Sequence, residues 1–230
     1  MTAVLTWPIV YRAHTHERPR GLPSSVVTSA PSFRHENMPE EVALLLPTNR
    51  GPTGLIGSVL TDPNLCRDAA LGLFLVSPFL NLPRDGARLL QAGITWVTNL
   101  PSVEQQDEDF SQQLTDVGLD RNRELCGLSE FRQQGFKTAA VVADGPGAAA
   151  AAAVEPDILF VMPRVADFAA GFPSLRQRGT AAQAVAEAAR AAGWRGLLLG
   201  LADRREAEHD GLWPEPLDGV ICRPVTAGPR

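Results

Sequence analysis

The chain repeats one pattern along its length: short runs dominated by apolar residues, with no regular alternation of apolar and polar positions. Eight such runs occur, each seven or eight residues long. They span residues 3–10, 24–30, 72–78, 94–100, 137–144, 157–163, 195–202 and 218–225. Unbroken apolar runs of this length are typical of strands buried on both faces, as in a parallel sheet.

Helical patterns lie between most of these runs, at residues 82–93, 111–135, 145–156 and 180–193. Thr180 is the expected N-cap of the last one, and Gly93, Gly135 and Gly193 are expected to end three of them. Strands that alternate with helices indicate an α/β fold. Eight strands in 230 residues favour a single domain over residues 1–230, a closed (β/α)8 TIM-like barrel.

Two helices of such a barrel are missing from the pattern. Residues 11–23, which read YRAHTHERPRGLP, are polar and rich in proline, and no helical pattern follows the eighth run. The barrel is therefore expected to lack regular first and last helices, and we expect a second copy of the chain to cover the apolar stripe left there. Residues 33–52 are longer than a simple crossover needs: they could form a lid, or residues 40–47 (EEVALLLP) could form an extra core segment. The glycine-rich residues 51–57 are interpreted as a loop.

Composition limits the possible partners. The formal net charge is −5, which argues against nucleic acid or an anionic membrane surface. Lys137 is the only lysine, so other cationic contacts are made by arginine. Three separated cysteines predict neither a zinc site nor a disulfide framework. With no secretory signal pattern in the first residues, we expect a cytoplasmic location.

The candidate site is placed by the barrel rule that active sites lie at the carboxyl ends of the strands. The residues expected to be catalytic there are Asn99, Asp144 and His35. Those expected to bind substrate are Arg34, Ser77, Ser102, Arg164 and Arg223. Arginines at one rim suit a carboxylate or a phosphate, which they bind through two hydrogen bonds at once. The partner is then a small anionic molecule.

Each of these interpretations has an alternative. The arginines could instead pair with nearby carboxylates, as Arg164 could with Asp167. Asp144 could be a general base or a metal ligand, or the N-cap of the helix that enters through Pro146. No cofactor is evident, because no glycine-rich phosphate-binding motif and no Asp-x-Asp pair after a strand is present. A divalent metal remains possible, with no ligand set to support it.

Residues 78–103, PFLNLPRDGARLLQAGITWVTNLPSV, resemble a stretch of the phosphoenolpyruvate-hydrolase-like TIM-barrel family, also called TIM-barrel signal-transduction proteins. The resemblance rests on the Asn-x-Pro turn at Asn99 and implies hydrolase or lyase chemistry on an oxoacid or a phosphorylated oxoacid. The family's histidine and glycine motifs after strands six to eight are replaced here by VMPRVADFAAG, LGLADRR and CRPV. The alternatives are therefore a catalytically degraded barrel that binds a ligand or a protein, and a barrel recruited to another biosynthetic reaction.

Overall fold

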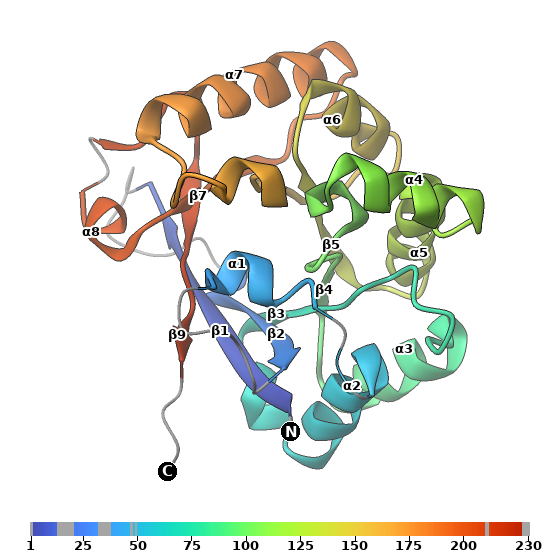
Figure 1. Ribbon diagram of the computed structural model, residues 1–230. Helices are drawn as coiled ribbons and strands as arrows, with labels where there is room; N and C mark the ends of the chain where they lie inside the picture. The colour runs from blue at the N-terminus through green and yellow to red at the C-terminus, as the bar shows by residue number, and fades with distance from the viewer. Residues whose placement is uncertain are drawn as a thin grey trace.

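In a computed structural model, which describes residues 2–12, 21–31, 38–46, 48, 50–209 and 212–226, the strands close into a barrel (Figure 1). The strand order is β2-β3-β4-β5-β6-β7-β8-β1-β9, and a further β1–β2 pairing closes the ring. The strands are β1 (Thr2–Tyr11), β2 (Ser25–Pro31), β3 (Ala69–Gly72), β4 (Trp96–Thr98), β5 (Lys137–Val142), β6 (Ile158–Val161), β7 (Leu197–Ala202), β8 (Gly219–Cys222) and β9 (Val225–Thr226). The predicted eight-stranded α/β barrel is confirmed.

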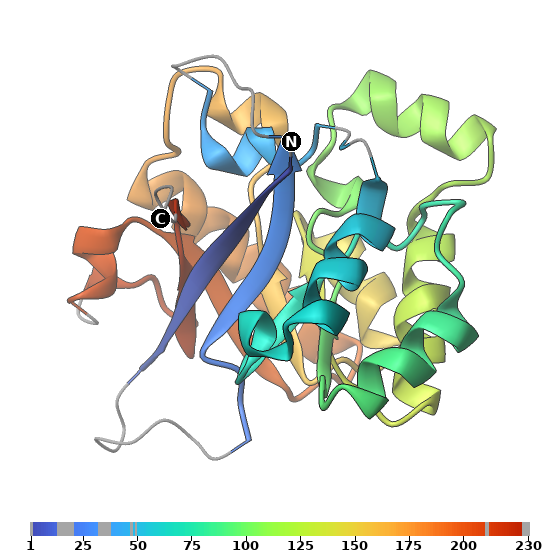
Figure 2. The ribbon, with the colours of Figure 1, turned by 90° about the horizontal axis from the view of Figure 1, so that it is seen from below.

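The direction of β1 departs from the expected parallel arrangement. β1 is antiparallel to β2, with Trp7 opposite Val26, and antiparallel to β8, with Val10 opposite Val220. None of the residues described between β1 and β2 is helical, so the chain returns as a hairpin (Figure 2). Arg12 after β1 therefore lies at the barrel end opposite the rim, where its backbone N–H donates to Asp218 O at 2.7 Å.

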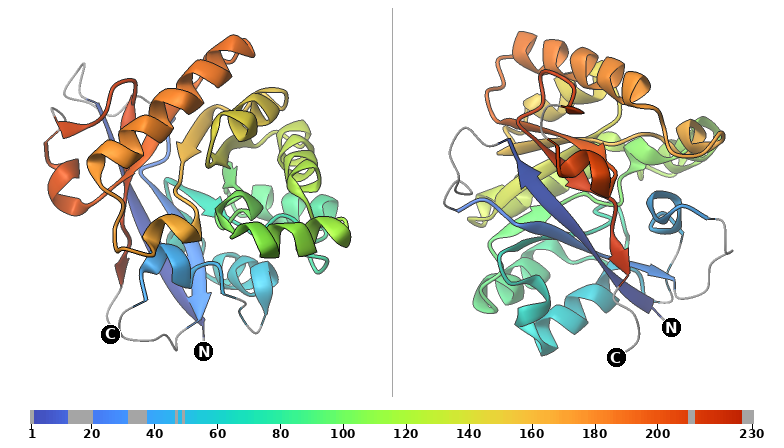
Figure 3. Two further views of the ribbon diagram at one scale, coloured as in Figure 1. Left: turned by 45° about the horizontal axis from the view of Figure 1, so that its top comes forward. Right: turned by 90° about the vertical axis from the view of Figure 1, so that its left-hand side faces the viewer.

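Helices lie outside the barrel between successive parallel strands. They are α1 (Glu40–Ala43), α2 (Gly51–Thr61), α3 (Leu82–Gln91), α4 (Glu108–Asp116), α5 (Arg121–Gln133), α6 (Gly145–Ala152), α7 (Leu175–Ala191) and α8 (Arg204–Ala207). Short 3-10 turns are η1 (Pro63–Cys66), η2 (Val103–Gln105) and η3 (Val165–Phe168). The surface of β1 carries no helix among the described residues, and it forms one open side of the molecule (Figure 3, right).

Two helix predictions are corrected. The segment expected to be a loop at residues 51–57 starts α2, because the apolar side chains of Leu55, Ile56 and Val59 pack on the barrel and outweigh the low helix propensity of glycine. The single helix expected over 111–135 is two, α4 and α5, since the chain turns at Gly118 with φ of +72°.

The start of α7 and the place of β3 also differ from expectation. α7 begins five residues before the expected N-cap, because Ser174 caps it with a full capping box. β3 ends at Gly72, where the third predicted strand was expected to begin. The run that follows β3 supplies Leu73 and Leu75 to the core from a loop.

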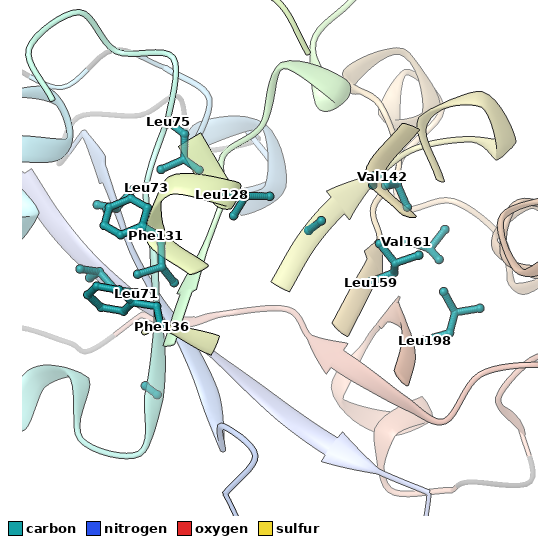
Figure 4. Packing of buried hydrophobic residues seen from close by; sticks show 14 of the residues in the cluster. Leu71, Leu73, Leu75, Leu128, Phe131, Phe136, Val142, Leu159, Val161 and Leu198 are labelled. Atoms are coloured by element: carbon teal, nitrogen blue, oxygen red, sulfur yellow. The ribbon is translucent and has the colours of Figure 1, made fainter. Parts of the chain in front are cut away.

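Two apolar clusters follow from strand alternation. The barrel interior holds Trp7, Trp96, Phe160 and Leu199, with the Trp7 Nε1–H donating to Thr28 Oγ1 at 2.9 Å. The outer cluster fills the space between strands and helices; Leu71, Leu73, Leu75, Leu128, Phe131, Phe136, Val142, Leu159, Val161 and Leu198 are labelled in Figure 4. Each fully buried side chain of this size contributes about 1.5–3 kcal/mol of transfer free energy.

Candidate functional site

The mouth of the barrel at the carboxyl ends of the parallel strands is filled. Leu44, directly after α1, and Phe168 of η3 belong to the buried interior cluster, and Phe172 packs against it. Arg223 follows β8 and pairs with the buried carboxylate of Glu41 on α1, with Nε to Oε1 at 2.5 Å and Nη2 to Oε2 at 3.1 Å. Its guanidinium also lies over the Phe172 ring, 4.8 Å from the centroid. Arg223 thus anchors α1 across the mouth.

The second predicted rim arginine is paired as well. Arg164 Nη2 lies 2.5 Å from Asp144 Oδ2, whereas Asp167 Oδ2 accepts only the backbone N–H of Arg164, at 2.8 Å. Asp144 is also the N-cap of α6, because its Oδ1 accepts the Gly147 N–H at 2.8 Å. Asp144 is thus an N-cap and Arg164 is ion-paired, as in the alternative interpretation, but the partner of Arg164 is Asp144 and not Asp167.

Asn99 is turned away from the barrel axis. Trp96 faces the interior, and alternation puts Val97 and Asn99 on the outer face toward α5. Its side-chain oxygen accepts the Val141 N–H at 2.7 Å. Its Nδ2 donates to Glu124 Oε2 at 2.8 Å, so Asn99 links β4 to β5 and α5.

Ser102 belongs to the same buried network. Its Oγ donates to Glu124 Oε2 at 2.5 Å and accepts the Glu104 N–H at 3.1 Å, which makes it the N-cap of η2. Burial raises the pKa of the Glu124 carboxyl to about 8, although hydrogen bonds from Ser102, Asn99 and the Val103 N–H oppose that shift. Nothing in this network is exposed to a ligand, since Asn99, Ser102 and Glu124 are at most 1% exposed.

The sequence analysis did not identify Glu124 as the hydrogen-bond partner of Asn99 and Ser102, or Glu41 as the ion-pair partner of Arg223. For Glu124 a signal exists: it shares one face of α5 with Leu128 and Phe131, at i+4 and i+7, so a carboxylate stands in an apolar stripe. Glu41 lies in a helix of only four residues, which is too short to show an apolar stripe around the carboxylate.

A pocket does open at the rim, beside the mouth rather than on the barrel axis. We call it the rim pocket; it has a volume of about 530 Å³ and lies between the carboxyl ends of β2–β4 and the start of α2. The described residues that line it are Ser29, Leu44, Leu45, Leu46, Thr48, Arg50, Gly51, Pro52, Thr53, Gly72, Leu73, Phe74, Ser77, Phe79, Pro101, Gln106 and Phe110. Of the predicted site residues, the lining includes Ser77, whose Oγ accepts the Phe79 N–H at 3.4 Å.

Arg50 is the one charged side chain among those lining residues, and no ion pair joins it to the described part of the chain. Its stem lies against the first turn of α2, because a Cβ built on Gly54 would come 2.8 Å from Arg50 Cβ. The positive end of the α2 dipole lies at the same place. The lining of the rim pocket is therefore mostly apolar, with one positive charge that has no ion-pair partner among the described residues.

A second cavity of about 480 Å³ lies between α7 and β6–β8. Its buried Arg178 is fully engaged, donating to Leu201 O at 2.6 Å, Pro173 O at 2.9 Å and Glu206 Oε1 at 2.6 Å. Asp144 at its edge is held by Arg164. This cavity also borders the carboxyl ends of β5–β7, but its lining includes the carboxylates of Asp144, Asp167 and Glu206. For an anion, the rim pocket is the stronger candidate, because Arg50 is the one charged side chain among the residues that line it.

Two predicted residues, Arg34 and His35, lie outside the described residues. Among the residues that the structure does describe, no group of three or more His, Cys, Asp or Glu side chains could hold a metal ion. The described helices include none long and apolar enough to cross a bilayer.

No protein-family model matches the chain, and no curated protein matches it. Among solved structures, it is similar to a FabK mutant from Thermotoga maritima, with 13% identity and a TM-score of 0.41 over 75% of this chain and 49% of that one. It is also similar to nitroalkane oxidase from Streptomyces ansochromogenes, with 12% identity and a TM-score of 0.38 over 66% of this chain and 48% of that one. The chain thus spans about half the length of both proteins.

Proposed function

We propose that this barrel binds a small anionic metabolite in the rim pocket. The observation that carries the proposal is Arg50, whose guanidinium has no ion pair with the described residues and is the one charged group among those that line the pocket. An anion there gains a charge-assisted hydrogen bond and the favourable end of the α2 dipole. The two arginines expected for this role, Arg164 and Arg223, are held by Asp144 and Glu41 instead.

The resemblance to the phosphoenolpyruvate-hydrolase-like family supports an oxoacid head group. Phe79 and Pro101, which lie in the resembling stretch, contribute walls of the rim pocket. Residues of that stretch therefore stand where the proposed ligand would sit. A carboxylate or phosphate next to the carbonyl of an oxoacid suits a bidentate guanidinium.

Ligand binding is favoured over catalysis because two of the three predicted catalytic groups, Asn99 and Asp144, are engaged in structural contacts. Asn99 is buried in the Glu124 network, and Asp144 caps α6. The second candidate is an enzyme of hydrolase or lyase type, which the resemblance suggests and for which Ser29 and Ser77 would supply pocket hydroxyls. Product formation from phosphoenolpyruvate or oxaloacetate, followed by NMR, distinguishes the two.

The binding proposal is tested by thermal unfolding with pyruvate, oxaloacetate and phosphoenolpyruvate. A ligand at 100 times its Kd stabilises the chain by about 2.7 kcal/mol, a readily measured shift in Tm. Arg50→Gln is expected to abolish the shift, whereas Arg164→Ala is expected to keep it. A ligand shift that survives Arg50→Gln contradicts the proposal.

Two glycines of α2 provide a matched pair of variants. Gly54→Ala forces the Arg50 stem to move, whereas a Cβ at Gly57 meets nothing within 4 Å. Both changes replace a helical glycine by alanine and raise the helix propensity by about 1 kcal/mol. Gly54→Ala is therefore expected to weaken the ligand shift, and Gly57→Ala to leave it unchanged.

A further inference from the structure

The rim pocket is bordered by three phenylalanines, Phe74, Phe79 and Phe110. Two of them are unusually open to solvent, since Phe79 is 74% exposed and Phe110 is 43% exposed. Exposed phenylalanine side chains leave apolar area in water that a bound apolar group would cover. Clustered at the border of a pocket, they indicate a recognition surface rather than scattered surface residues.

The backbones that carry these two rings are fixed. Ser77 Oγ accepts the Phe79 N–H at 3.4 Å, and the next residue, Leu80, donates its N–H to Ser77 O at 3.2 Å. Asp107 caps α4 by accepting the Phe110 N–H at 2.8 Å. The loop after β3 and the first turn of α4 therefore hold both rings at the pocket without burying them in the core, so a ligand meets a preorganised surface.

The volume of the pocket points the same way. A three-carbon oxoacid would leave most of the 530 Å³ empty, because cavities of this size accept ligands of many more atoms. The remaining walls are mostly apolar, with Leu44, Leu45 and Leu46 among them, and their polar side chains are uncharged. The space beyond Arg50 is thus suited to a large apolar group and not to a second charge.

We infer that the occupant of the rim pocket is an aromatic anion, such as an aryl oxoacid or an aryl phosphate, whose ring packs against Phe79 and Phe110 while its anionic group meets Arg50. The inference rests on the proposed function and adds the chemical class of the uncharged part of the ligand. The pocket should bind an aromatic group more tightly than an aliphatic one, because aromatic rings attract each other in offset or edge-to-face geometry.

Calorimetry with matched pairs of probes tests the inference: phenylpyruvate against pyruvate, and phenyl phosphate against inorganic phosphate. The phenyl member of each pair is expected to bind at least about tenfold more tightly. Phe79→Ala and Phe110→Ala are each expected to weaken the phenyl probes by about five- to tenfold and to leave pyruvate unchanged. Leu65→Ala is the control, since Leu65 is 40% exposed and lies outside the pocket lining.

The outcomes separate this inference from the proposed function. Equal affinity within each pair, lost in Arg50→Gln, overturns the aromatic class and leaves the anion site standing. No binding of any probe overturns both. Phenyl probes that bind tightly but are insensitive to Phe79→Ala and Phe110→Ala also overturn the inference. So does a change of oligomeric mass in those two variants without a change in affinity, because the rings then serve an interface.

Discussion

Asn99 Nδ2 donates to Glu124 Oε2 at 2.8 Å, both side chains are buried, and this contact fixes the carboxyl end of β4 to α5. The same Asn99 side chain accepts the Val141 N–H of β5, so one residue connects three elements. These buried hydrogen bonds give the Asn99 of the Asn-x-Pro turn a structural role.

Glu124 predicts a pH dependence of stability. Its pKa is raised from an ordinary value of 4.5 to about 8 by burial, so between these values the folded chain binds the proton and the unfolded chain does not. The free energy of unfolding should therefore fall as the pH rises through this window, by on the order of 4 kcal/mol from this group. Urea unfolding at pH 5, 6, 7 and 8 measures the slope.

Glu124→Gln is the variant that isolates this effect. Its amide has the same size and does not ionise, so this variant should flatten the slope. The exposed Glu130→Gln on the same helix is the control and should keep the wild-type slope. Parallel slopes for wild type and Glu124→Gln would disprove the assignment.

Arg223 and Glu41 predict a second stability effect. Arg223→Ala leaves the fully buried Glu41 carboxylate without its partner, which should destabilise the chain by about 2–3 kcal/mol, toward the low end because Arg223 is 38% exposed. Adding Glu41→Gln should recover part of the loss, since the unpaired charge is removed. Denaturant midpoints of the single and double variants check this, and purely additive losses would contradict the pairing.

The sequence predicted those strands whose formation depends on one local signal. The unbroken apolar runs identify β2 and β4–β8, because burial on both faces leaves no room for alternation. The direction of β1 was not accessible, since it depends on how the chain returns after Tyr11. α2 was missed because its helix is stabilised by packing of Leu55 and Val59 and not by its glycine-rich sequence.

The site was accessible only in part. Ser77 lines the rim pocket from the loop after β3, and not from the end of a strand as expected. The direction of the Asn99 side chain follows by alternation from that of Trp96, but only once it is known that Trp96 faces the barrel interior. The Arg223–Glu41 pair joins residues 182 positions apart, and no local pattern announces it. Arg50, Phe79 and Phe110 lie far apart in the sequence, and only the folded chain shows that they line one pocket.

Thiol reactivity provides a simple check of the packing. Cys66 and Cys222 are buried, and burial raises their thiol pKa values to about 12 and about 11, whereas Cys126 on α5 is exposed. Since the thiolate is the reactive form, native protein should react with Ellman's reagent at one cysteine and unfolded protein at all three. Cys126→Ser should abolish the native reaction, and a second fast thiol would contradict the placement of Cys66 or Cys222.

The outer face of β1 predicts self-association. Thr6, Pro8 and Val10 alternate with the buried side chains of this strand and have no covering helix among the described residues (Figure 3, right), and Val10 is 37% exposed. β1 already bonds β2 and β8, so a second copy would pack on its face rather than add a strand. Light scattering at micromolar concentration should give a dimer, and Thr6→Lys, which places a charge in the middle of this face, should give a monomer, because burying an unpaired charge is unfavourable. A wild-type chain that is monomeric under these conditions would show that β1 is stable without a cover.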